Sequence, residues 1–144
     1  MTLEEAFRAF GARKWHHYST WSAIAENELT VITLWDHLMS FNKEEKKEYW
    51  DCFGTEGWWH SEIGNIKRIE HIQYSIENHN GFFRAIYITP KDENANPLEI
   101  DKRGARPAEK KWWKVIEFDS MSGEFKAKCD WSWSLQKGEL FPKV

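Results

Sequence analysis

Residues 61–81 constrain the fold of this chain most, because their isoleucines recur at helical spacing between two segments that are typical of strands. The spacing is three or four residues, charged and polar residues fill the positions between, and the isoleucines are Ile63, Ile66, Ile69, Ile72 and Ile76. This is the pattern of an amphipathic helix. Asn80 and Gly81 tolerate the left-handed conformation that commonly ends a helix. The sequence therefore predicts one main helix, with the isoleucines on its apolar face.

Two hairpins are predicted around it. Residues 15–25 and 29–35 are the strands of the first, with a turn at 26–28, and the second of these strands is apolar enough to be central and buried. Residues 112–119 and 124–135 form the second hairpin, in which Gly123 supplies the positive φ of the turn. Residues 82–89 add one more strand, ended by Pro90. In the last strand one side consists of Phe125, Ala127, Cys129, Trp131, Trp133 and Leu135.

The remaining segments carry weaker signals. Thr2 and Glu5 have the spacing of a capping box, which predicts a short N-terminal helix. Asn42 and the charged residues after it predict a short solvated helix. Residues 91–110 are expected to form one long surface loop, and residues 138–144 a loose tail.

Together these segments predict a single α+β domain over residues 1–144. We expect about five mostly antiparallel strands in a curled sheet or partial barrel, one main amphipathic helix and a short N-terminal helix, the helices covering one face. Apolar residues make up 41% and charged residues 30% of the chain, which argues against disorder.

Localisation follows from what the chain lacks. No apolar run approaches the roughly 20 residues that cross a bilayer, and Glu4 and Glu5 stand where a signal peptide is basic. We therefore expect a cytoplasmic protein, in which Cys52 and Cys129 are reduced thiols.

The ten tryptophans are the first candidate for a binding site. An indole that is partly open to solvent stacks on flat ligands or holds a cation against its face. Neighbouring residues on a strand face opposite sides of a sheet. At least one member of each pair, Trp58–Trp59 and Trp112–Trp113, is therefore expected outside the main core, unless the sheet is covered on both faces.

A basic segment leads directly into the second of these pairs. Cations beside stacking platforms are what single-stranded or flipped-out nucleic acid requires, and Arg103 and Arg106 each have the geometry to hold a phosphate or carboxylate. The net charge of −3 excludes a generally basic nucleic-acid surface but leaves room for a local one. The cations of the segment are Lys102, Arg103, Arg106, Lys110, Lys111 and Lys114.

Signals for metal or catalysis are few. No histidine or cysteine pair has a recognised metal-binding spacing, and no phosphate-cradling loop, dinucleotide fingerprint or nucleophile elbow is present, so neither a metal nor a cofactor is predicted. Asp36 and His37 close the predicted central strand, where they are placed to act as an acid–base pair with His16 or His17.

The first third of the chain resembles small uncharacterised bacterial and phage proteins of mobile elements, some of which lie near HNH-type nucleases. The resemblance rests on residues 18–23, Tyr-Ser-Thr-Trp-Ser-Ala, and 31–36, Val-Ile-Thr-Leu-Trp-Asp. The clustered His and Asn of an HNH motif are missing, so the resemblance implies mobile-element or defence biology, and hence nucleic acid, without a catalytic role.

These observations predict a non-enzymatic binding module whose aromatic and basic surface takes a nucleobase or other planar ligand. Its expected partner is single-stranded or modified nucleic acid, or a small planar molecule. The alternatives are a small-molecule binder or self-associating homodimer with a tryptophan-lined cavity or dimer face, and a small hydrolase using His and Asp. The predicted ligand-binding residues are Trp15, His17, Tyr18, Trp21, Trp35, Asp36, His37, Arg103, Arg106, Lys111, Trp112 and Trp113.

Overall fold

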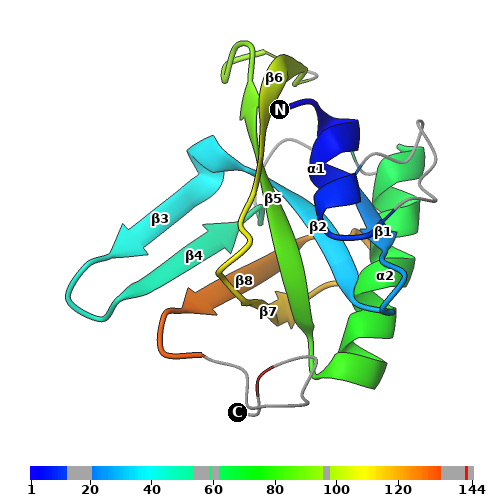
Figure 1. The fold of residues 1–144 in the computed structure, drawn as a ribbon, viewed down its shortest axis with the longest axis vertical. Coiled ribbons are helices and arrows are strands. Elements are labelled where there is room, and N and C mark those ends of the chain that lie inside the picture. The colour runs from blue at the N-terminus through cyan, green and yellow to red at the C-terminus, as the bar shows by residue number, and fades with distance from the viewer. Residues whose placement is uncertain (13–20, 54–58, 60–61, 96–97, 134–141, 143–144) are drawn as a thin grey trace.

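The structure, a computed structural model, is an α+β fold in which two helices pack against one mixed, mostly antiparallel sheet (Figure 1). It describes residues 1–12, 21–53, 59, 62–95, 98–133 and 142. The helices are α1 (Leu3–Ala9) and α2 (Ile63–His79), with a 3-10 turn, η1 (Asp36–Leu38). The strands are β1 (Ser22–Ile24), β2 (Thr30–Trp35), β3 (Met39–Asn42), β4 (Lys47–Asp51), β5 (Phe82–Pro90), β6 (Ile100–Pro107), β7 (Trp113–Phe118) and β8 (Phe125–Asp130).

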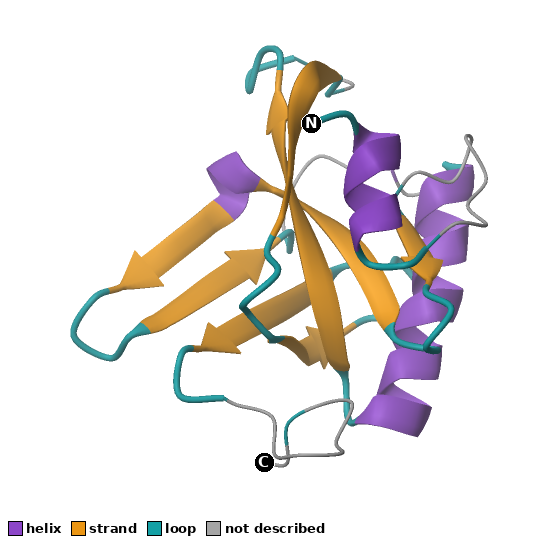
Figure 2. Ribbon diagram, viewed as in Figure 1, coloured by secondary structure: helices purple, strands orange, loops and turns teal. Residues whose placement is uncertain are grey.

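The sheet is open, with strand order β1-β2-β5-β7-β8-β4-β3 and with β6 added beside β5. β2 and β5 are its one parallel pair among the described residues, and every other pairing there is antiparallel. The expected curled sheet or partial barrel of about five strands is therefore wrong. In Figure 2 the hairpin of β3 and β4 extends away from the body of the sheet, on the side opposite α2.

β5 is the strand that joins the two halves of the sheet. Phe82 and Phe83, at its start, pair with β7, whereas residues 86–90 pair with β6. β2 runs along its other side over residues 84–88. A strand enclosed in this way is buried on both faces, and its apolar composition follows from that.

The helices cover opposite faces of the sheet, which corrects the expectation that both lie on one. Val31 packs in a cluster with Ala6 and Phe7 of α1, whereas Ile32 packs with Ile72 of α2. Consecutive residues of a strand point to opposite faces, so the two clusters are separate layers on either side of β2.

The orientation of α2 differs from the prediction, because most of its isoleucines face solvent. Ile63, Ile66 and Ile76 are 55%, 50% and 43% exposed, and of the predicted face only Ile72 is fully buried. A step of three residues falls about 60° short of a full turn, so residues 63, 66, 69 and 72 drift around half the helix instead of forming one stripe. The buried face consists of Gly64, Asn65, Arg68, Ile72, Ser75 and His79.

Polar side chains can line this buried face because they have partners there. Asn65 Nδ2 donates to the carbonyl of Ser122 at 2.8 Å, and Ser75 Oγ donates to the carbonyl of Phe82 at 2.8 Å. A buried polar group with a hydrogen bond costs little, whereas the same group without one costs several kcal/mol. Asn65 thereby ties α2 to the turn between β7 and β8.

The two predicted hairpins, the capping box and the left-handed end of α2 are confirmed, but β8 ends at Asp130, so Trp131 and Trp133 lie beyond the strand instead of continuing it. β1 and β2 pair across the turn at 26–28, where Glu28 has a φ of 70°. β7 and β8 pair across 119–124, and Gly123 has a φ of 87°. Thr2 and Glu5 form both bonds of the capping box, and Asn80 ends α2 in the left-handed conformation.

Two segments were predicted wrongly. The expected helix after Asn42 is a hairpin of β3 and β4, in which the Asn42 side chain accepts from the Glu45 amide across the turn. The expected loop at 91–110 contains β6. β3 and β6 are edge strands without a regular buried alternation, and in β4, which does alternate in burial, one of the buried residues is the charged Glu48, so no alternation of apolar and polar residues marks these strands in the sequence. The predicted tail lies outside the described residues apart from Pro142, which is buried.

Neither described helix is long and apolar enough to cross a membrane.

Candidate functional site

The predicted site residues fall into four places. Trp15, His17 and Tyr18 lie outside the described residues, as do His16 and the first residues of the predicted first strand. The other nine are described, and the structure separates them into an interior arginine site, a cluster at the end of β2, the two faces of β6, and a surface at the open end of the sheet.

Trp21 serves an interior arginine. The guanidinium of Arg68 is buried and lies 4.8 Å from the centre of the Trp21 ring, 5.3 Å from Trp59 and 5.0 Å from Phe125. Burial lowers its pKa to about 10, so it remains charged near neutral pH. Its Nη2 donates a hydrogen bond to Asn65 Oδ1, at 3.3 Å. The three ring faces therefore supply much of the electrostatic compensation that a carboxylate usually supplies.

A second cluster joins the end of β2 to β6. Arg106 Nη2 lies 3.3 Å from Asp36 Oδ2, and Arg106 Nη1 donates to Thr89 Oγ1 at 3.3 Å. Thr89 in turn donates to Asp36. The predicted contact between residues 35–37 and the basic segment is thus present. The carboxylate of Asp36 already accepts these two hydrogen bonds, and the Trp35 and His37 rings meet edge to face at 6.2 Å.

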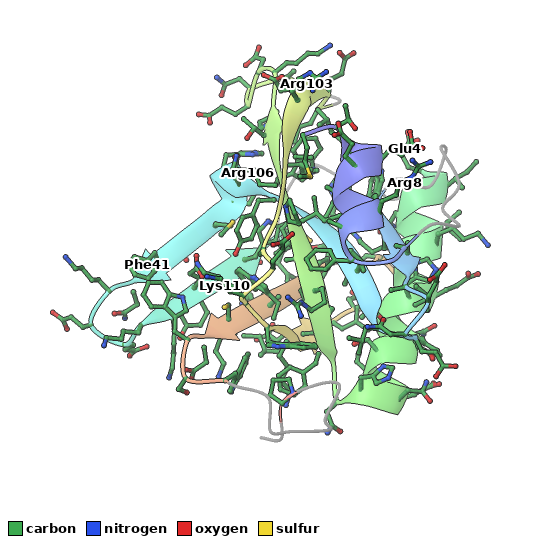
Figure 3. All side chains as sticks on the ribbon, in the orientation of Figure 1. Glu4, Arg8, Phe41, Arg103, Arg106 and Lys110 are labelled. Carbon is green, nitrogen blue, oxygen red and sulfur yellow. The ribbon has the colours of Figure 1, made fainter. Side chains whose placement is uncertain are left out.

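Arg103 and Arg106 do not share a ligand-binding surface. Arg106 is opposite Tyr87 in the register of β5 and β6, on the face that carries Asp36. Arg103 lies near α1, because its charge contributes to the lowered pKa of Glu5 in that helix. Hydrogen bonds from Thr2 are the larger cause of this lowering. Figure 3 shows the two arginines pointing in different directions. The two arginines therefore have different neighbours: Arg106 is bound to Asp36 and Thr89, whereas Arg103 lies where the pairing of β6 with β5 is irregular.

Trp112 and Trp113 are both buried. Trp113 belongs to the core beneath α2, and Trp112 packs with Leu29 and Phe82 on the other face. The guanidinium of Arg84 also lies over the Trp112 ring, at 4.4 Å. The sheet is covered on both faces at this point, so neither indole is free for a ligand.

The exposed aromatic surface lies instead at Trp131, which is one of the ten tryptophans but not one of the predicted site residues, and at Phe41, which the sequence pattern did not single out. Trp131 is 46% exposed and Phe41 is 51% exposed, and their rings stack with centres 5.0 Å apart and planes 25° apart. We call this pair the aromatic ledge. It is formed across β4, between the residue that follows β8 and the outermost strand, β3.

Lys111 and a buried carboxylate hold the ledge in place. Glu48 Oε2 accepts from Lys111 Nζ at 2.8 Å and from Trp131 Nε1 at 2.9 Å. Lys111 Nζ also lies 5.0 Å from the centre of the Trp131 ring. The indole is therefore fixed by its N–H and cannot rotate without breaking a bond to a buried charge.

A continuous line of side chains runs from the ledge to Arg106. The line consists of Phe41, Glu48, Cys129, Trp113, Tyr87 and Arg106. Each of the first three residues is opposite the next on the neighbouring strand, and Trp113 Nε1 donates to the Tyr87 hydroxyl at 3.2 Å. Burial raises the pKa of Cys129 to about 12 and also raises the pKa of Tyr87, so both are protonated near neutral pH. The interior of this line is polar but uncharged except at Glu48.

The surface at this end of the sheet carries further cations. Figure 3 shows Phe41, Lys110 and Arg106 around the angle between the β3–β4 hairpin and β6. Lys110 is exposed, and Lys46 is tied to the ledge because its carbonyl accepts from the Trp131 amide at 3.1 Å. A planar, anionic molecule placed on the ledge would therefore meet ammonium groups from two segments.

Other groups with chemical potential are buried or apart. Ser22 Oγ and His71 Nδ1 share a hydrogen bond of 2.7 Å, but Ser22 is buried and burial lowers the pKa of His71. Cys52 and Cys129 are free thiols. Cys52 bonds to Phe125, four residues before Cys129 on β8, so about 13 Å of strand separates the two positions. No group of three metal-binding side chains occurs among the described residues.

Comparison with protein-family models, with curated proteins and with solved structures gives no match for this chain. The candidate site therefore rests on its own geometry.

Proposed function

We propose that this protein is a binding module whose aromatic ledge, Phe41 and Trp131, takes a nucleobase or another planar ligand, with single-stranded or modified nucleic acid as the preferred partner. The observation that carries the proposal is an exposed pair of stacked rings, fixed by a buried carboxylate and flanked by lysines. Nucleobases stack on aromatic side chains with about 1–3 kcal/mol per base.

The flanking charges favour an anionic ligand. The ammonium of Lys111 lies over the Trp131 ring but is shared with Glu48, Lys46 is exposed and bonded to Trp131 through its backbone carbonyl, and Lys110, next to Lys111 in the sequence, is exposed. The overall charge of −3 means that this cationic character is local, so binding should be weak and steeply dependent on salt. This surface replaces the predicted one, in which Trp112, Trp113 and Arg103 were to take part.

The proposal is tested by fluorescence anisotropy with a labelled single-stranded oligonucleotide at low salt. Trp131→Ala and Phe41→Ala are expected to weaken binding about 10- to 100-fold, since each removes one stacking ring. Lys110→Ala should weaken it less and reduce its salt dependence. Ile116→Ala, at an exposed apolar residue of β7, is the matched control.

The outcomes separate the proposal from its alternatives. Binding that survives loss of both rings contradicts the ledge as the site. No binding of any oligonucleotide at low salt, together with saturable binding of small aromatic molecules, favours the small-molecule alternative. The geometry gives no separate support to the hydrolase reading, because Asp36 is engaged with Thr89 and Arg106.

A further inference from the structure

The outward side of α2 carries a regularly spaced row of residues, most of them apolar, which is separate from the residues that pack on the sheet. Ile66, Ile69, Gln73 and Ile76 are separated by three, four and three residues. These are the intervals of the a and d positions of a heptad, which line one narrow stripe of a helix. We call these four residues the isoleucine seam.

The seam faces away from the protein. Ile66 and Ile76 are 50% and 43% exposed, Gln73 is exposed, and Ile69 is half-buried at the edge of the sheet contact. The residues of α2 that touch the sheet are others, with Arg68, Ile72 and Ser75 at their centre. Figure 1 shows α2 along the flank of the molecule, where its outer side is accessible. Ile63, which precedes the seam, is exposed as well, and three exposed isoleucines on one 17-residue helix are unusual for a surface without a partner.

The open edge of the seam is acidic. Glu70 and Glu77 each follow a seam residue by four positions, which places them at the flanking positions that determine partner choice in coiled coils. Both are exposed. On the opposite edge the equivalent positions, Asn65, Ile72 and His79, are buried against the sheet. Only the acidic edge is therefore available to a partner.

We propose that the isoleucine seam docks one amphipathic helix of a partner protein, whose apolar face is flanked by Lys or Arg. A second copy of this chain is disfavoured, because an antiparallel pair of seams brings Glu70 and Glu77 against their own counterparts. A basic helix instead places cations against these carboxylates. Gln73, in the middle of the seam, favours a partner with a polar residue at the matching position, which would set the register.

The experiment uses the full-length, 15N-labelled protein and two synthetic amphipathic peptides of about 21 residues, long enough for three heptads. Both have Leu at the apolar positions and one Asn, and they differ only in having Lys or Glu at the flanks. The Lys peptide is expected to shift the amide signals of residues 66–77 and to bind at least about tenfold more tightly than the Glu peptide. Ile66→Glu or Ile76→Glu should remove this binding, while Ile116→Glu, the matched exposed control, should leave it.

A charge-reversed protein, Glu70→Lys with Glu77→Lys, keeps the experiment decisive if an isoleucine variant fails to fold. It is expected to reverse the preference to the Glu peptide. Equal binding of the two peptides, or no shift with either, overturns the proposal. A dimer of the wild-type protein in sedimentation equilibrium that Ile66→Glu dissociates also overturns it, in favour of a second copy as occupant. None of these results depends on the aromatic ledge.

Discussion

Gly123→Ala tests how the turn between β7 and β8 is locked onto α2. Gly123 has a φ of 87°, and a Cβ at this position would lie 2.2 Å from Asn65 Oδ1. Asn65 is buried and has no free space into which to withdraw, because it donates to Ser122 at 2.8 Å and accepts from Arg68 at 3.3 Å. The substitution therefore strains the backbone and also breaks at least one of these bonds.

Gly11→Ala is the matched control. Gly11 has a φ of 76°, but nothing lies within 4 Å of the added Cβ. A left-handed conformation costs an L-residue about 1–2 kcal/mol, and this is the whole expected effect at Gly11. At Gly123 a lost buried hydrogen bond adds about 1–3 kcal/mol, more if the bond to charged Arg68 is the one broken. The expected totals are about 1–2 kcal/mol for Gly11→Ala and about 2–5 kcal/mol for Gly123→Ala.

Urea unfolding, followed by tryptophan fluorescence, measures both free energies of unfolding. Asn65→Ala combined with Gly123→Ala removes the clash, so the double variant should lose less stability than the sum of the single ones. Equal losses for the two glycine variants would refute the reasoning, since they would show that Asn65 moves aside at no cost.

Three further predictions concern buried polar groups. Burial lowers the pKa of His71, so the unfolded state takes up a proton before the folded state does as the pH falls. Thermal melts should therefore show full stability above about pH 6.5 and a decline below it. His71→Gln should reduce this decline. An unchanged pH profile in the variant would mean that His71 is not the titrating group. Glu48→Leu, which has no acceptor atom, leaves Lys111 and the Trp131 indole without their shared acceptor, so denaturant unfolding should show a loss of about 1–3 kcal/mol. The double variant with Lys111→Met should recover part of this loss, and strict additivity would argue against the shared carboxylate. Cys52 and Cys129 are buried and have raised pKa values, so a thiol reagent should modify neither in the native protein and both after unfolding; rapid labelling of one native thiol would contradict their placement.

Features set by local chemistry could be predicted from the sequence. The Thr2–Glu5 capping box, the turn at 26–28 and the positive φ of Gly123 each depend on a few neighbouring residues, and each is present. The central strand β2 was also recognised, because its burial on both faces gives a continuous apolar run.

The errors arose where solvent exposure or long-range contacts override the local pattern. β3 is a mostly exposed strand, so its sequence has no buried alternation. α2 turns a polar face to the sheet because Asn65 and Arg68 find partners in the β7–β8 region, far away in the sequence, and Ser75 bonds to Phe82 at the start of β5. The parallel pairing of β2 with β5 is likewise invisible in either strand alone.

The candidate site shows the same division. Residues 35–37 were predicted to lie on one surface with the basic segment, and Asp36 does contact Arg106 of that segment. The ledge was missed because it depends on the register that brings β3, β4 and β8 together: Phe41 is opposite Glu48, and Glu48 is opposite Cys129. No spacing in the sequence relates Phe41 to Trp131.

The aromatic ledge is tested most directly by the indole N–H signals of the 15N-labelled protein during titration with a short single-stranded oligonucleotide. The account predicts that the Trp131 signal, assigned with Trp131→Phe, shifts or broadens as the ligand saturates, while the signals of the buried Trp50 and Trp113 stay in place. Saturable binding that leaves the Trp131 signal unmoved, or that moves the buried indoles instead, would contradict it.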